Sequence, residues 1–285
     1  SIAQRDTSKP HFNSTSSHVD MAFKIYQLSG YGDSWKKYIQ SRLTGTKHLQ
    51  MQGNGTEGSN NENTWDHHNG WSEDPSSADY YSHMWKRAPS YFDVCCYTGT
   101  GSATTVAHNL DAAPEMMWIK GRDVSDNWVV YHKDIASNKF LQLNATSNAG
   151  VNANMLTTTA PTDSVFSVGT DGGTNNSGSD YIAYLFATTN GVSKVGSFSH
   201  NNSSTTNVDC GFSNGCRWLL IKRHDGTSDW RLYGVGTGIL GGNDDYIQLN
   251  NTDALSSGDF VDPLSSGFTV TTNYDTGDYI FYAIA

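Results

Sequence analysis

The segment 63–74 carries the densest set of side chains that could do chemistry. Its possible metal ligands are Asp66, His67, His68, Glu73 and Asp74, and its possible platforms for sugar rings are Trp65 and Trp71. Adjacent histidines do not match the spaced ligands of a zinc site. Indole faces beside amide and carboxylate groups are chemically suited to carbohydrate. A structural or interface use of this segment is the first interpretation, sugar contact the second and metal binding the third.

Other polar clusters have simpler interpretations as turns. Asp244 and Asp245 are sequence neighbours, and neighbours rarely face one glycosidic bond from both sides at the separation of about 5–10 Å that acid and base need. The oxygen-rich stretches 171–180 and 273–278 lack the spacing of a known calcium loop, and hairpin turns account for them. The sequence has neither a Gly-x-Ser-x-Gly elbow nor a phosphate-binding glycine loop before a helix. These patterns predict a protein that is not an enzyme and holds no metal or cofactor.

Composition narrows the class of partner. The 285 residues include 28 Asp and Glu but only 18 Lys and Arg, which gives a formal net charge of −10. The basic residues form no cluster that could neutralise several phosphates, so nucleic acid is not an expected partner. No apolar run approaches the roughly 20 residues that a membrane-spanning helix needs, so membrane insertion is not expected. The first residue is Ser, which indicates either a removed leader or upstream region, or the tail end of a longer polypeptide.

The four cysteines do not show whether the protein works in an oxidising or a reducing compartment. Cys95 and Cys96 are adjacent and would point to opposite faces of a strand, which disfavours a bond between them. Cys210 and Cys216 flank a turn-forming stretch, and the ends of such a hairpin could lie within disulfide range. A Cys210–Cys216 disulfide and two free thiols are therefore equally compatible with the sequence.

Three landmarks recur in the same order, about a hundred residues apart, and they indicate three copies of one unit. The first is an apolar strand, a turn and a Trp, with a Tyr three residues later: Trp35 and Tyr38, Trp128 and Tyr131, Trp230 and Tyr233. The second is a short strand with a central Gln, at 49–51, 141–143 and 247–249, and the third is a closing strand that begins Asp-Tyr, at 79–85, 180–186 and 278–284. We expect each repeated Trp to pack into the core of its own unit rather than to bind a ligand.

The pattern within each copy predicts the fold class. Apolar and polar residues alternate over four to eight positions between Gly-Asn, Asp-Gly and Ser-Gly turns, as in half-buried antiparallel strands. We therefore expect an all-β chain of three tandem antiparallel β-sandwich units, jelly-roll or lectin-like, with almost no helix. The expected division is a linker or arm at 1–20, a diverged copy 1 at 21–89, copy 2 at 90–190 and copy 3 at 191–285. Copies 2 and 3 share an opening strand, at 92–97 and 195–198, for which copy 1 has no convincing counterpart.

Several stretches resemble repeat units in large structural proteins of tailed phages, notably marine and cyanobacterial ones. They are Trp85-Lys-Arg-Ala-Pro-Ser-Tyr-Phe-Asp-Val-Cys-Cys-Tyr-Thr-Gly-Thr-Gly101, Met117-Trp-Ile-Lys-Gly-Arg-Asp123 and the Tyr-rich closing strands. The resemblance covers most of residues 85–285 and, more weakly, copy 1. It implies a part of a tail fibre or another virion surface appendage, and it brings no signature of functional residues to this sequence.

The expected function follows from the β repeats together with this resemblance. It is a structural and adhesive component of a phage virion, located on the virion or outside the cell. Its expected partners are copies of itself, other virion proteins and a host surface polysaccharide. A secreted lectin-like carbohydrate-binding protein is the alternative, and a polysaccharide depolymerase with a cleft between copies is a third, weaker one.

Overall fold

The chain folds almost entirely into antiparallel strands. The computed structural model describes residues 12–13, 18–27, 35–59, 65, 70–71, 80–234 and 238–285. Within these ranges, helix is limited to α1 (Gly172–Asn175) and a three-residue 3-10 turn (Arg42–Thr44). The prediction of an all-β chain with almost no helix is confirmed. No helix in the same ranges has the length and apolar character needed to cross a membrane.

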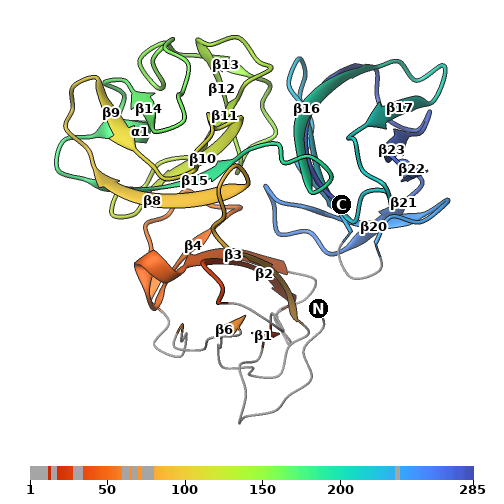
Figure 1. Ribbon diagram of the computed structural model, residues 1–285, viewed down its shortest axis with the longest axis horizontal. Helices are drawn as coiled ribbons and strands as arrows, with labels where there is room; N and C mark the ends of the chain where they lie inside the picture. The colour runs from red at the N-terminus through yellow and green to blue at the C-terminus, as the bar shows by residue number, and fades with distance from the viewer. Residues whose placement is uncertain are drawn as a thin grey trace.

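Three large sheets are the main elements, and each is built from one predicted copy (Figure 1). The first sheet, in the order β5-β4-β3-β2-β7, consists of β2 (Met21–Gln27), β3 (Trp35–Ser41), β4 (Lys47–Gln50), β5 (Gly58–Ser59) and β7 (Tyr80–Trp85). The second, in the order β13-β12-β11-β10-β15-β8, consists of β8 (Phe92–Thr98), β10 (Met116–Gly121), β11 (Val129–His132), β12 (Lys139–Gln142), β13 (Gly150–Val151) and β15 (Asp180–Phe186). The third, in the order β21-β20-β19-β18-β24-β16, consists of β16 (Ser193–His200), β18 (Trp218–Arg223), β19 (Arg231–Tyr233), β20 (Asp244–Gln248), β21 (Ser256–Gly258) and β24 (Gly277–Ile284).

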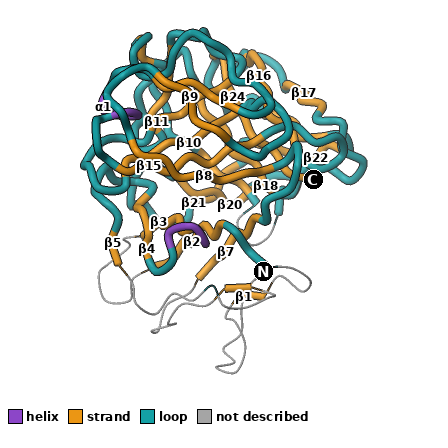
Figure 2. Tube along the Cα trace, turned by 60° about the vertical axis from the view of Figure 1, so that its left-hand side comes forward, coloured by secondary structure: helices purple, strands orange, loops and turns teal. Residues whose placement is uncertain are grey.

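The three orders agree strand for strand, except that the first sheet has no described strand beside β7. In the second sheet, β8 pairs with the closing strand β15 from Phe92 opposite Phe186 to Thr98 opposite Asp180. In the third, β16 pairs with the closing strand β24 in the same way. Figure 2 shows β7 at the lower edge of the first sheet, next to β2. This difference matches the missing opening strand of copy 1 in the sequence.

Small sheets cover the outer faces of the second and third large sheets. They are the pair β9 (Thr104–Ala107) and β14 (Val165–Val168), and the group β17 (Thr206–Asp209), β22 (Val261–Leu264) and β23 (Gly267–Val270). Each encloses a hydrophobic cluster of its own, around Phe166 in copy 2 and Phe268 in copy 3. The remaining strands pair with each other: β1 (Phe12–Asn13) from the predicted arm and β6 (Gly70–Trp71) from copy 1.

The inner faces of all three large sheets meet in one central hydrophobic cluster. The repeated tryptophans Trp35, Trp128 and Trp230 all belong to it, and their exposed fractions are 8%, 0% and 1%. These rings are core residues, but the core is shared by the three copies rather than enclosed by each one. Figure 1 shows the reason, because the orange, yellow-green and blue groups surround a common centre.

Hydrogen bonds between neighbouring sheets follow the repeat. The indole N–H of Trp128 donates to the carbonyl of Gln50 at 2.8 Å, which joins copy 2 to copy 1. The indole N–H of Trp230 donates to the carbonyl of Gln142 at 2.9 Å, which joins copy 3 to copy 2 in the same way. The two repeated sequence landmarks, Trp and Gln, are thus the two halves of one contact between copies.

Contacts of copy 3 with copy 1 close the ring. The backbone N–H of Trp35 donates to the carbonyl of Thr252 at 2.8 Å. The buried ammonium of Lys37 donates to the carbonyl of Asn251 at 2.7 Å. An ion pair between Arg122 and Glu57, with Nε and Oε2 2.8 Å apart, adds a further contact between copies 2 and 1.

Candidate functional site

The edge of the first sheet borders the clearest candidate site, a groove with a cavity volume of about 490 Å³. Four consecutive residues of β7, 82–85, form one wall of it. The rest of the lining is Tyr91, at the start of copy 2, and the copy 3 residues Arg217, Trp218, Gly234 and 284–285, so the groove lies mainly between copy 1 and copy 3. We call it the β7 groove.

Aromatic rings dominate this groove. The rings of Trp85 and Trp218 meet edge to face with their centroids 5.5 Å apart, and the ring of Tyr282 lies 5.5 Å from Trp218. Trp85 and Trp218 are only 3% and 6% exposed, so both are mostly covered by neighbouring side chains. Large aromatic surfaces of this kind dominate the energetics of protein interfaces.

The polar groups of the groove are incompletely paired. The indole N–H of Trp218 and Nε2 of His83 have no hydrogen-bond partner, although both atoms are buried. Buried polar atoms are normally bonded, and leaving one unpaired costs about 1–3 kcal/mol. Unpaired atoms of this kind also occur elsewhere in the described core, such as the indole N–H of Trp118 and Nε2 of His132.

Most of the described side chains that line the groove are uncharged at neutral pH. Burial lowers the pKa of His83 to about 4, so its imidazole is neutral at pH 7. Burial raises the pKa of the Tyr91 phenol to about 12, so it stays protonated. Arg217 carries the charged side chain of the described lining, which contains no Asp, Glu, Lys or Cys side chain. The side chains of the lining therefore offer mainly aromatic contact and one guanidinium group.

Gly234 allows two segments of the groove wall to approach closely. Its φ is +88°, and a Cβ atom at this position would lie 2.0 Å from the carbonyl oxygen of Arg217. Any other residue would push β19 away from the segment that carries Arg217 and Trp218. The glycine thereby helps to place these two side chains beside β7.

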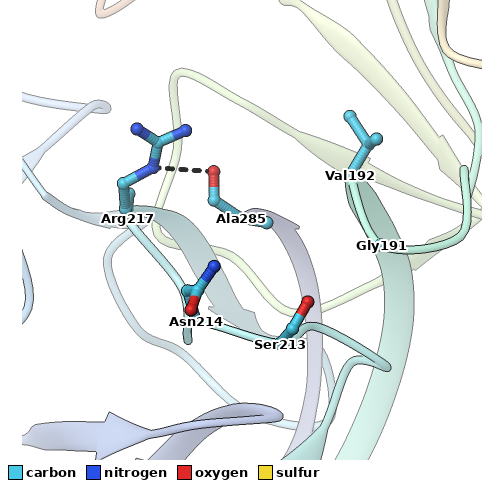
Figure 3. Close-up of a pocket in the computed structure, with 6 residues that line it drawn as sticks. All are labelled: Gly191, Val192, Ser213, Asn214, Arg217 and Ala285. Carbon is cyan, nitrogen blue, oxygen red and sulfur yellow. Dashed lines mark hydrogen bonds between the residues drawn. The ribbon is translucent and has the colours of Figure 1, made fainter.

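A second hollow of about 430 Å³ adjoins the β7 groove and shares Arg217 and Ala285 with it. Figure 3 shows its other lining residues, Gly191, Val192, Ser213 and Asn214, around the bond from the Arg217 Nε to the backbone oxygen of Ala285, which is 2.8 Å long. Hydroxyl, amide and guanidinium groups therefore lie beside the aromatic groove.

The two tryptophans of the segment 63–74, Trp65 and Trp71, are buried. Trp65 and Trp71 stack on each other with centroids 5.6 Å apart, in a cluster with Val19 and Ala22. Their exposed fractions are 6% and 0%, so neither ring offers a free face to a sugar, and that interpretation is wrong for these two rings. The N–H of Trp65 is bonded to the carbonyl of Gly45 and that of Trp71 to the Ser82 hydroxyl. Asp66, His67 and His68 lie outside the described residues, as do Glu73 and Asp74.

Of the two alternatives for Cys210 and Cys216, the structure has the free thiols. Cys210 and Cys216 are both free and buried. The Cys216 thiol donates to the carbonyl of Trp218 at 3.0 Å, and burial raises the pKa of both thiols to about 12. The two residues pack as small apolar side chains in the outer cluster of copy 3.

The remaining predicted residues are held by hydrogen bonds or are at least half-buried. Tyr38 accepts a hydrogen bond from the Gln50 amide, Tyr131 is half-buried, and Tyr233 is buried with its hydroxyl 3.0 Å from that of Tyr274. Asp244 is buried and accepts a bond from the backbone N–H of Leu240, while its neighbour Asp245 is half-buried. Among the described residues, no three His, Cys, Asp or Glu side chains gather in a way that could hold a metal ion.

Sequence reasoning missed the groove residues His83, Trp85, Tyr91, Arg217 and Trp218. One signal was present in the closing landmark, where copy 1 has His83 and Trp85 at the positions of Tyr184 and Phe186 in copy 2. The other was the missing opening strand. Neither signal alone showed that copy 3 would supply the opposite wall.

Comparison with known proteins identifies a family but not an activity. The model of one family, a domain of unknown function (DUF7483), matches residues 38–285. The matched region includes most of copy 1 and all of copies 2 and 3. Searches of curated proteins and of solved structures gave no match.

Proposed function

We propose, for a chain that belongs to the DUF7483 family, a structural and adhesive role on a phage virion, as part of a tail fibre or similar surface appendage. In this proposal the chain is not an enzyme. Three related β-sandwich units act together as one rigid block, which contacts copies of itself, other virion proteins and a host surface glycan.

One observation carries the proposal. The three large sheets share a central hydrophobic cluster, and hydrogen bonds from each copy to the next close them into a ring. Buried side chains of all three copies pack together in this cluster, so relative motion of the copies would disrupt the core itself. A rigid block with an aromatic, nearly uncharged groove at one edge supports a role in assembly and attachment better than one in catalysis.

The test is the mass of the purified chain in solution, measured by light scattering on a size-exclusion column. The measurement should be made over a range of protein concentrations at physiological ionic strength, because the formal charge of −10 makes copies repel one another at low salt. A discrete oligomer or a filament is expected. A chain that stays monomeric at every concentration would contradict self-assembly of this segment.

A secreted lectin-like protein is the second candidate, and the hollow around Arg217 favours it. Ser213, Asn214 and Arg217 present hydroxyl, amide and guanidinium groups next to the aromatic groove, a combination that binds sugar hydroxyls and ring faces. A monomeric chain that binds polysaccharide, with affinity reduced by Asn214→Ala and Arg217→Ala, would favour this candidate. The control is Leu240→Ala, which changes an exposed side chain outside the hollow.

A further inference from the structure

The β7 groove occupies the place that a flanking strand fills in the other two sheets. The β7 residues that line the groove, 82–85, correspond to 183–186 of β15 and 281–284 of β24. Those residues pair with 92–95 of β8 and with 193–196 of β16. Among the described residues no strand occupies this place, so the groove has the length of about four strand residues, roughly 13 Å.

The backbone of β7 presents hydrogen-bonding groups to this space. The carbonyl of Trp85 accepts a bond from the N–H of Asp20 at 2.9 Å and so faces β2. Successive residues of a strand face opposite neighbours, so the N–H and C=O groups of Ser82 and Met84 face the groove. The equivalent edge of β15 is bonded to the strand beside it, as shown by the 3.1 Å bond from the N–H of Ala187 to the carbonyl of Tyr91.

The flanking strands also complete the central cluster. Phe92 and Val94 of β8 and Val195 of β16 are at most 2% exposed and all belong to it. At the equivalent place in the first sheet, Trp85, Trp218 and the unpaired Nε2 of His83 lie beside the groove instead. A strand with apolar side chains at alternate positions would pack beside these rings and pair with the edge of β7.

The geometry points to a strand-acceptor site: the β7 groove binds an extended segment of another polypeptide chain, antiparallel to β7, with apolar residues at alternate positions facing the central cluster. The inference rests on the proposed function for the source of that segment, which is a neighbouring subunit of the assembly. Strand addition supplies affinity through backbone bonds and specificity through alternate side chains.

The other two sheets favour an extended strand as the occupant. At the equivalent place β8 pairs with β15 and β16 pairs with β24 along their whole lengths. Among the described residues, no strand pairs with the outer edge of β7. In addition, a nearly uncharged aromatic groove suits an apolar strand better than a charged ligand.

The first experiment offers the full chain a labelled peptide of residues 90–97, with both cysteines replaced by serine, and measures fluorescence anisotropy. The carbonyl of Tyr91 faces β15, so by alternation the N–H groups at positions 93 and 95 face the acceptor strand. N-methylation at 93 and 95 should weaken binding at least about tenfold, because it removes backbone donors and blocks the ladder. N-methylation at 94 and 96 serves as the matched control and should leave affinity nearly unchanged. Equal affinities of the two methylated peptides, or no binding of any peptide, would overturn the inference.

The second experiment changes the protein. Met84→Pro removes an N–H that faces the groove, whereas Met84→Ala loses the same side chain but keeps that N–H. Only the proline variant should lose the peptide, with circular dichroism used to show that both variants keep their sheets. Loss of binding in both variants, or in neither, would contradict strand addition.

Hydrogen exchange measured on the chain without peptide distinguishes an open groove from one that the chain itself covers. The amides of Ser82 and Met84 should exchange rapidly in the free chain and slowly with the peptide bound. Slow exchange in a monomeric chain without peptide would mean that the chain covers its own groove, and the inference would be wrong. A chain that forms oligomers but binds no peptide would refute the strand-acceptor site while leaving the proposed assembly role intact.

Discussion

The indole bonds between copies give a prediction with an internal control. Trp128 and Trp230 donate to Gln50 and Gln142 of the preceding copy, whereas the indole N–H of Trp35 has no hydrogen-bond partner. All three rings belong to the central cluster. Replacing each Trp by Phe removes similar buried volume at equivalent places, but it breaks a hydrogen bond between copies in only two of the three.

The expected magnitudes follow from these contacts. The smaller ring should reduce the free energy of unfolding by about 1–2 kcal/mol at each site. A lost bond and an unpaired carbonyl should add about 1–2 kcal/mol for Trp128→Phe and Trp230→Phe. We therefore expect losses of about 2–4 kcal/mol for these two variants and about 1–2 kcal/mol for Trp35→Phe.

Urea unfolding followed by circular dichroism measures these differences, and comparison at the transition midpoints limits extrapolation error. Because the copies share one core, a single transition is expected for the wild type and for all three variants. Equal losses in the three variants would show that the indole bonds do not hold the copies together. Separate transitions would contradict the shared core.

Two further predictions concern buried titratable groups. Burial lowers the pKa of Lys222 from 10.5 to about 8, so between these pH values the unfolded chain holds a proton that the folded chain has released, and stability rises with pH. The urea midpoint should therefore increase more between about pH 7.5 and pH 9 for the wild type than for Lys222→Met. Identical pH profiles of the two proteins would contradict a lowered pKa of Lys222 in the folded chain. For the cysteines, the exposed Cys96 should react with a thiol reagent in the native chain, whereas Cys210 and Cys216 should react only on unfolding. Alkylation in denaturant without reductant should label all four thiols by mass spectrometry, and a mass that lacks two labels would reveal a disulfide.

The sequence predicts the strands well because their signals are local. Alternating residues, turn residues and the recurrence of Trp, Gln and Asp-Tyr identify the large sheets, and these landmarks fall at equivalent positions in them. The nearby sequence does not determine which part of the chain packs against each face of a strand. All six residues of β10, from Met116 to Gly121, are buried, because one face meets the outer cluster and the other meets the central one. Alternation distinguishes the two faces of a strand but does not say which copy lies against each.

The candidate site shows the same limit. The polar neighbours of Trp65 and Trp71 predict exposed rings, but both rings pack near Ala22 on the outer face of the first sheet. The β7 groove combines residues of copy 1 with Arg217 and Trp218 of copy 3, about 130 positions further along the chain. The contact between them depends on closure of the ring, which no short stretch of sequence reports.

The direction of the bonds between copies has an evolutionary consequence. Each copy offers an indole on one side and a carbonyl on the other, so the same contact could join separate chains as well as linked ones. A single ancestral copy with both groups would close on itself as a symmetric trimer. Gene duplication and fusion would then release each position from the demand of symmetry. One copy could then diverge at its flanking strand, the place where the first sheet has no described strand beside β7, while the other two preserved the shared core.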